Sequence, residues 1–118
     1  MKGQPFYKRL GFAINGLCLA FFREHSFRYH VIASVGVLIA LLFIRPSPVW
    51  WVIGTITVGL VMITELINTA IETLADHIHP EQHFEIQVVK DIAAGAVLVA
   101  SIMGILVAAA FLYAYFHQ

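Results

Sequence analysis

"IAAGAVLVASIMGILVAAAFLYAYF" (residues 92–116) is the stretch that decides the fold class. It holds 25 residues without a charged side chain, and a helix of that length crosses the ~30 Å hydrocarbon core of a bilayer. The composition agrees, because 60% of the 118 residues are hydrophobic and only 12% are charged, whereas soluble domains carry roughly a quarter. We therefore expect an all-α integral membrane protein that forms one domain over residues 1–118. The net charge of zero gives no indication of nucleic-acid binding.

Two further apolar stretches precede this segment. The first runs from 27 to 44 and ends at the sequence RPSP (45–48), where two prolines cannot continue a helix and predict a tight turn. The second is expected to form a helix over 49–75. A polar loop over 77–89 then leads to the third helix, expected over 90–116. The sequence therefore predicts three membrane-spanning helices.

Residues 6–22 carry apolar side chains at helical spacing, with Lys8, Arg9 and Asn15 elsewhere around the turn. This pattern is typical of an amphipathic helix that lies in the membrane interface. A helix packed against the rest of the bundle would show the same pattern, so both interpretations stay open at this point.

The basic residues predict the orientation. Five of the seven lie before or at the start of the first span: Lys2, Lys8, Arg9, Arg23 and Arg28. The positive-inside rule then places the N-terminus and the 77–89 loop in the cytoplasm and the C-terminus outside. All seven acidic residues fall on the cytoplasmic half: Glu24, Glu65, Glu72, Asp76, Glu81, Glu85 and Asp91.

The helix expected over 49–75 carries a polar stripe that continues one residue past its end. At ~100° per residue, four polar side chains share an arc of roughly 80°: Glu65, Asn68, Glu72 and Asp76. A carboxylate in or near hydrocarbon costs several kcal/mol, so this face must meet protein, water or a cation. Glu65 lies ~24 Å from the start of the helix at ~1.5 Å per residue, close to the inner interface.

Other charged residues lie at the same depth and complete a candidate site. Glu24 precedes the first span and Asp91 begins the third, and oxygen ligands of this kind suit Mg²⁺ bound together with phosphates. Lys90 is the strong cation beside them and is available for a phosphate. The alternative is a polar network that only holds three helices together.

The motifs resemble those of a known family. ELINTAIETLAD (65–76), followed by KDIAAGAVL (90–98), is similar to the signature of the bacterial membrane lipid kinases, the diacylglycerol kinase and undecaprenol kinase family. EHSFRYH (24–30) and FAING (12–16) resemble earlier motifs of the same family. The resemblance implies ATP-dependent phosphorylation of a membrane lipid alcohol at the cytoplasmic interface of the bacterial inner membrane. It also implies a homotrimer and a kinase without the usual nucleotide-binding motifs, which this sequence indeed lacks.

The family's site residues carry over by position. The resemblance implies that Glu65 is the catalytic base and that Glu24 and Glu72 are ligands of the Mg²⁺ that accompanies ATP. The remaining positions, assigned to cofactor binding, are Asn68, Asp76, Lys90 and Asp91. Arg28 stands where the family often keeps a basic residue.

The preferred lipid stays open between undecaprenol and diacylglycerol. His30 and the AAGAV run (93–97) look like the polyprenol branch, Ser26 departs from it, and the length of the loop between Asp76 and Lys90 matches the diacylglycerol branch. A small cation- or proton-coupled transporter is the alternative function, and a non-enzymatic scaffold subunit is a third, since buried glutamates also mark ion pathways.

A separate set of residues could bind zinc: His77, His79, Glu81 and His83. The interpretation that we favour is a polar surface loop whose charge varies with pH.

Overall fold

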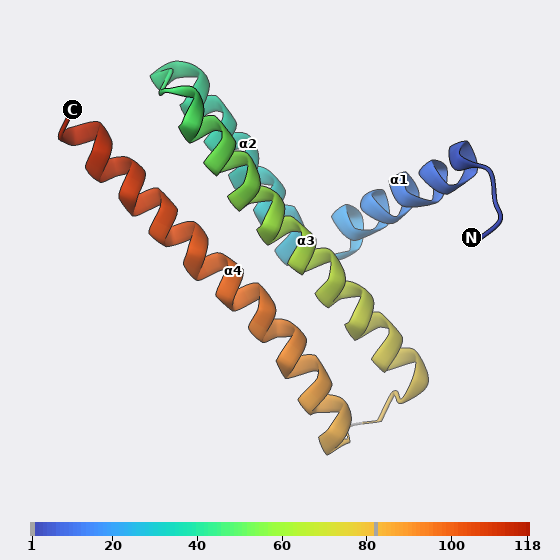
Figure 1. Cartoon of the computed structure of the whole chain (residues 1–118). Helices are drawn as coiled ribbons and strands as arrows, with labels where there is room; N and C mark the ends of the chain where they lie inside the picture. Colours follow the sequence, from blue (N-terminus) through green and yellow to red (C-terminus); the bar gives the residue numbers. More distant parts are fainter. Residues whose placement is uncertain (1, 82) are drawn as a thin grey trace.

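The protein is an all-helical, multi-pass membrane protein. A computed structural model describes residues 2–81 and 83–118. They form four helices (Figure 1): α1 (Phe6–Arg23), α2 (His25–Ile44), α3 (Pro48–Ile78) and α4 (Phe84–Phe116). By length and composition, α2, α3 and α4 can each cross a membrane. The prediction of three membrane-spanning helices is therefore confirmed.

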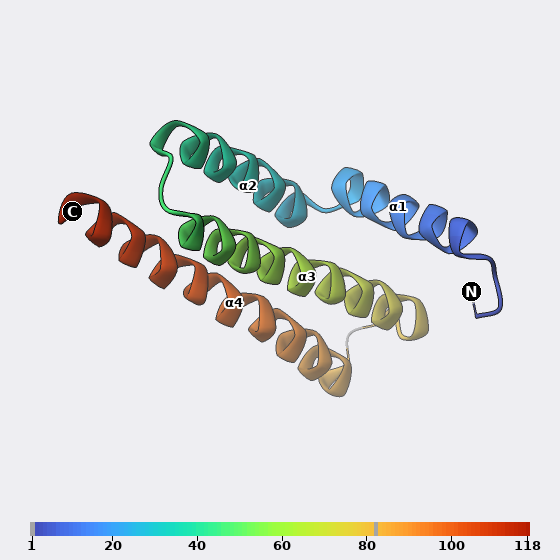
Figure 2. The same ribbon diagram turned by 45° about the horizontal axis from the view of Figure 1, so that its top comes forward.

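The three long helices run antiparallel to their neighbours in sequence, and α3 packs most extensively on α4. The C-terminus consequently lies at the same end of the molecule as the turn between α2 and α3 (Figures 1 and 2). At this end Trp50 packs edge-on against Phe111, with ring centroids 5.1 Å apart, and joins α3 to α4.

The turn between α2 and α3 is tight, as the two prolines predict. Arg45 ends α2 in the left-handed conformation (φ 55°, ψ 58°), and its backbone N–H donates to the carbonyl oxygen of Leu41 at 2.9 Å. Pro48 occupies the first turn of α3, where a missing N–H leaves no hydrogen bond broken.

The predicted bounds of the loop over 77–89 are wrong at both ends. Helix α3 continues to Ile78, and α4 begins at Phe84 rather than at Lys90. His83 caps α4, because its Nδ1 accepts the backbone N–H of Glu85 at 3.2 Å. Polar helical turns outside the hydrocarbon have the same hydropathy as a loop, so the apolar pattern alone could not locate these ends.

Small side chains predominate among the buried apolar residues. Four of the six are alanines, and the full set is Ala20, Phe27, Val61, Ala75, Ala93 and Ala100. Small residues let helix backbones approach closely in a membrane, where lipid-facing side chains are as apolar as the core. A Cβ atom added to Gly104 would lie 3.7 Å from Thr57 Cγ2, which is ordinary van der Waals contact across α3 and α4.

Helix α1 lies next to the N-terminal end of α2 and away from α4 (Figures 1 and 2). Only its C-terminal end packs, since Ala20 is its one buried residue. Arg28 fixes the bend between α1 and α2: its guanidinium donates to the carbonyl oxygens of Phe21 (2.9 Å) and Phe22 (3.2 Å). Of the two interpretations of this segment, this packing favours the interfacial helix.

The orientation of the bundle is a prediction that chemical labelling can test. In a Cys18→Ser background, we expect a membrane-impermeant thiol reagent applied from outside to label His117→Cys and not His79→Cys. The reason is the clustering of basic residues before and at the start of α2, which keeps that end in the cytoplasm. Permeabilised cells should show labelling at both positions. Labelling of position 79 alone in intact cells would contradict the orientation.

Candidate functional site

Glu65 is the buried charged residue of the described chain. It lies on α3 with 5% of its surface exposed, and its Oε1 lies 3.1 Å from His30 Nε2 on α2. A carboxylate in a membrane-spanning segment is stable only with a partner and marks a functional site by default. The structure therefore places the residue predicted as catalytic base in a buried position with one polar partner.

The stripe on α3 becomes more exposed toward the inner end of the helix. Asn68 and Glu72 are half-buried and Asp76 is exposed. Asn68 Nδ2 donates a long hydrogen bond (3.4 Å) to Glu72 Oε1, while Asn68 Oδ1 is buried without a hydrogen-bond partner. A buried amide oxygen without a partner is costly. Its position beside a carboxylate offers two oxygens to a cation or to a hydrogen-bond donor.

Helix α4 contributes one of its two predicted residues to this face. Lys90 Nζ forms an ion pair with Asp76 Oδ1 and so joins the inner ends of α3 and α4. Asp91 is exposed and accepts a hydrogen bond from Gln87 Nε2 at 2.8 Å, on its own helix. Neighbouring residues on a helix differ by ~100° in direction, so Lys90 and Asp91 cannot both point at α3.

Glu24 occupies the bend between α1 and α2. Its backbone is extended, and its half-buried side chain does not cap α2. Among residues 2–81 and 83–118, hydrogen bonds and ion pairs join Asn68 to Glu72 and Lys90 to Asp76, but none joins Glu24 or Asp91 to the stripe on α3.

A metal site in a protein needs several ligand side chains that converge on one point. In 2–81 and 83–118, no group of three His, Cys, Asp or Glu side chains could hold a metal ion together. This finding does not support the zinc cluster in the 77–83 segment. Mg²⁺ bound with a nucleotide needs only one or two carboxylates, with phosphate oxygens and water completing its shell. The Glu72 carboxylate beside the unpartnered Asn68 oxygen fits that requirement.

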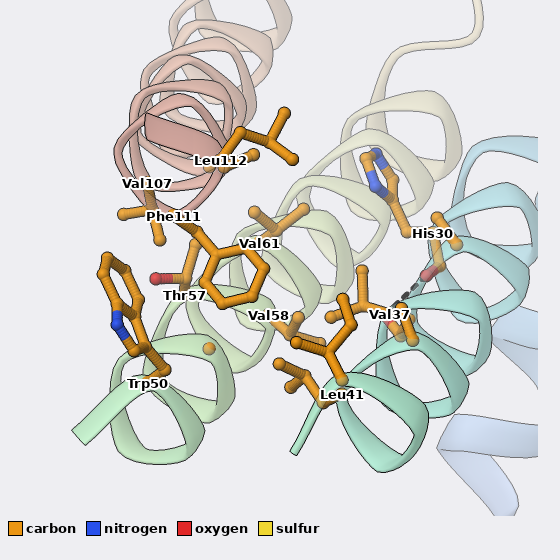
Figure 3. Close-up of a pocket in the computed structure, with 17 residues that line it drawn as sticks. His30, Val37, Leu41, Trp50, Thr57, Val58, Val61, Val107, Phe111 and Leu112 are labelled. Carbon is orange, nitrogen blue, oxygen red and sulfur yellow. Dashed lines mark hydrogen bonds between the residues drawn. The ribbon is translucent and has the colours of Figure 1, made fainter. Parts of the chain in front are cut away.

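Sequence reasoning named His30 only as a mark of one family branch and missed its contact with Glu65. The available signal was a polar ring at the start of the long apolar part of α2, at the same end of the bundle as the acidic stripe. His30 also lies at one end of an apolar cavity of about 450 Å³ between α2, α3 and α4 (Figure 3). Trp50 and Phe111 line the opposite end of this cavity, and Val61 lies one helical turn from Glu65.

Comparison with known proteins shows to which family the chain belongs. The family model of prokaryotic diacylglycerol kinase matches residues 11–112. The chain belongs to this family. The predicted membership of the bacterial membrane lipid kinases is thereby confirmed.

Three relatives illustrate the range of this kinase family. A diacylglycerol kinase from Synechocystis sp. is 35% identical over 97 residues, which are 81% of this chain and 55% of that protein. The undecaprenol kinase of Bacillus subtilis is 32% identical over 102 residues (86% and 83%). The diacylglycerol kinase of Escherichia coli K12 is 30% identical over 109 residues (92% and 89%). The chain thus spans about half the length of the first relative and most of the other two.

Proposed function

We propose that this chain transfers the γ-phosphate of ATP to the hydroxyl group of a membrane lipid alcohol, at the cytoplasmic face of the bacterial inner membrane. The observation that carries the proposal is Glu65. It is a carboxylate buried in a membrane-spanning helix, paired with His30 at the end of an apolar cavity, in a chain of this kinase family.

The proposed reaction requires mainly positioning and charge stabilisation. Glu65 accepts the proton of the lipid hydroxyl while the hydroxyl oxygen bonds to the γ-phosphorus, and the bond from that phosphorus to the bridging oxygen of ADP breaks. The products are a lipid phosphate, ADP and one proton. A buried carboxylate suits this role because it lies where a lipid hydroxyl, and not bulk water, can reach it.

The apolar cavity supports a lipid as the acceptor. Helix α2 runs from His30 toward Ile44, and α3 runs from Trp50 toward Glu65, so the cavity extends from the level of Glu65 toward the opposite membrane face. A lipid that presents its hydroxyl to Glu65 from the inner leaflet directs its hydrocarbon the same way. A water-soluble alcohol would gain nothing from these walls.

The polar end of α3 and α4 supports a nucleotide on the cytoplasmic side. Asn68 and Asp76 on α3, with Lys90 and Asp91 on α4, are the proposed nucleotide-binding residues. Glu72 and Glu24 would hold Mg²⁺, which when bound would offset the negative charge of the phosphates. Glu24 lies on a different element from Glu72 and does not contact it within one subunit, so the metal would join the α1–α2 bend of one subunit to α3 of another.

One experiment tests the proposed function and identifies the preferred lipid. Purified protein in vesicles, given labelled ATP and Mg²⁺, is offered diacylglycerol, undecaprenol or triacylglycerol, which has no free hydroxyl. We expect label in one or both alcohols and none in triacylglycerol. Absence of label in every alcohol, with protein that is folded and correctly inserted, would contradict the proposed function.

We also propose that the working form is a homotrimer with sites shared between subunits. The three spans leave most of their apolar side chains exposed, and one subunit brings neither Glu24 nor Asp91 into contact with the stripe on α3. Mixed oligomers of two inactive variants, Glu24→Gln and Glu65→Gln, should therefore regain a fraction of wild-type activity. Activity that stays at background would argue that each subunit works alone.

Lys90 offers a further prediction, because loss of an ion pair affects protein stability, whereas loss of a phosphate contact affects the KM for ATP. An exposed pair such as Lys90–Asp76 contributes about 0–1 kcal/mol to stability, whereas a hydrogen bond between a charged side chain and phosphate contributes about 1.5–3 kcal/mol. We therefore expect Lys90→Met to raise the KM for ATP roughly tenfold or more with little change in thermal stability. Lys90→Arg keeps a cation that can contact both Asp76 and a phosphate and is the matched comparison, so its KM for ATP should stay within a few-fold of wild type. An unchanged KM for ATP in Lys90→Met would contradict the phosphate contact.

A further inference from the structure

His30 is the side-chain partner that the structure gives to Glu65. Its Nε2 lies 3.1 Å from Glu65 Oε1, across the interface between α2 and α3. The neighbouring polar groups are engaged elsewhere: Thr64 Oγ1 donates to the carbonyl oxygen of Val61 at 2.9 Å, and Asn68 Nδ2 donates to Glu72. Ser34 is engaged as well, because its Oγ donates to the backbone carbonyl oxygen of His30 at 2.6 Å.

We propose that His30 is a positioning residue for the Glu65 carboxylate, an inference that rests on the proposed kinase function. Its ring Nε2 contacts one carboxylate oxygen, Oε1, and thereby leaves the second oxygen to accept the proton of the lipid hydroxyl. The ring nitrogen does not contact the reacting atoms in this arrangement. It acts by fixing where the base is.

The need for such a residue follows from the side chain of the base. An unrestrained glutamate near the inner end of a membrane helix turns toward water, since charge is costly in hydrocarbon, and ordering a glutamate side chain costs up to ~2 kcal/mol of rotamer entropy. A polar contact from another helix holds the carboxylate against both tendencies. Side chains that orient a metal ligand typically change activity by about 10–100-fold when they are removed, and we expect a similar factor for a side chain that orients a base.

The location of His30 adds a second consequence. The ring lines one end of the apolar cavity (Figure 3), and its Nε2 also lies 3.1 Å from Glu65 Oε1. The carboxylate is therefore held next to the space from which, under the proposed function, the lipid hydroxyl arrives. A misplacement of about 1 Å at a reacting group can cost on the order of 10² in rate, so loss of this contact should lower kcat more than it changes the KM for ATP.

Three substitutions separate positioning from packing. His30→Gln places an amide N–H near the site of the ring Nε2, His30→Asn places it near Nδ1, and His30→Leu removes the donor. We expect His30→Leu and His30→Asn to lower kcat by about 10–100-fold with a nearly unchanged KM for ATP. His30→Gln should recover to within a few-fold of wild type. Should His30→Leu fail to fold, the comparison of His30→Gln with His30→Asn gives the same answer, since both are polar amides.

The double variant tests whether His30 acts through Glu65. In the Glu65→Gln background, His30→Leu should cause little further loss, because residues that act as a unit are not additive. An equal loss of kcat in the Gln, Asn and Leu variants, or a full additional loss in the double variant, would overturn the positioning role.

A measurement without turnover separates this inference from the proposed function. Solid-state NMR on vesicle-reconstituted protein, with ¹⁵N-histidine and ¹³C-glutamate, should show a short His30–Glu65 contact that is lost in His30→Gln. Wild-type protein that shows this contact but labels no lipid would contradict the kinase function and leave the pairing in place. If the wild-type protein is active but lacks the contact, or if His30→Leu has the wild-type kcat, the role of His30 is overturned and the kinase function stands.

Discussion

Glu65→Gln should lower the turnover of lipid phosphorylation by a factor on the order of 10²–10⁴, the usual contribution of a general base. The amide is nearly the same size as the carboxylate, so the packing of α3 against α2 is preserved while the proton acceptor is lost. Nucleotide binding should stay near the wild-type level, because the carboxylate acts on the transition state and not on bound ATP. The measurement is the initial rate at saturating ATP and lipid, with ATP affinity determined separately.

Excess metal provides the control for this prediction. A missing proton acceptor is not restored by mass action, so raising Mg²⁺ or replacing it with Mn²⁺ should not rescue Glu65→Gln. Glu65→Asp, which shortens the side chain and keeps the charge, should be less impaired than the glutamine variant. Recovery of Glu65→Gln at high metal concentration would show that Glu65 is a metal ligand and not the base.

Glu72→Gln should raise the Mg²⁺ concentration needed for half-maximal activity by about 10–100-fold, by analogy with other lost metal-site partners. Glu72 lies beside the unpartnered Asn68 Oδ1 on the half-buried part of the α3 stripe. A ligand's loss shifts a binding equilibrium, and mass action can shift it back. Excess Mg²⁺ or Mn²⁺ should therefore restore part of the activity.

The matched comparison is a metal titration of Glu72→Gln beside Glu65→Gln, with both proteins shown to form the same oligomer in detergent. The expected result is rescue of the first variant and not of the second. Equal rescue of both would mean that the roles of the two glutamates are assigned wrongly. Near-wild-type activity in both would remove the reaction from α3.

The sequence and the structure agree where hydropathy alone is decisive. Three apolar stretches, the longest over 92–116, predicted three spans. The two prolines after Arg45 predicted a tight turn, and four polar residues at helical spacing predicted a stripe on one face of α3. These features depend on local composition and helix geometry, which a single sequence contains. The start of α4 at Phe84 was not predictable in this way, because a polar helical turn outside the bilayer does not differ in hydropathy from a loop.

Contacts between helices were harder to predict from the sequence. After His30, helix α2 is apolar on all sides except for Ser34, so this part of its sequence does not indicate which side faces α3. The pairing of His30 with Glu65 depends on that rotation. The same limit applies to Lys90 and Asp91, which the motif places together but whose directions on α4 differ. Lys90 contacts Asp76, whereas Asp91 is held by Gln87 on its own helix.

The central claim is that this chain, acting without another protein, phosphorylates a membrane lipid alcohol with Glu65 as the base. The direct measurement is the transfer of label from γ-³²P-ATP to extracted lipid by purified wild-type protein in vesicles that contain one lipid alcohol and Mg²⁺, beside Glu65→Gln prepared identically. Wild-type protein should produce labelled lipid phosphate that increases with time, and the variant should do so at a rate lower by a factor at least on the order of 10². Equal labelling by both proteins, or none by the wild type with either diacylglycerol or undecaprenol, would contradict it.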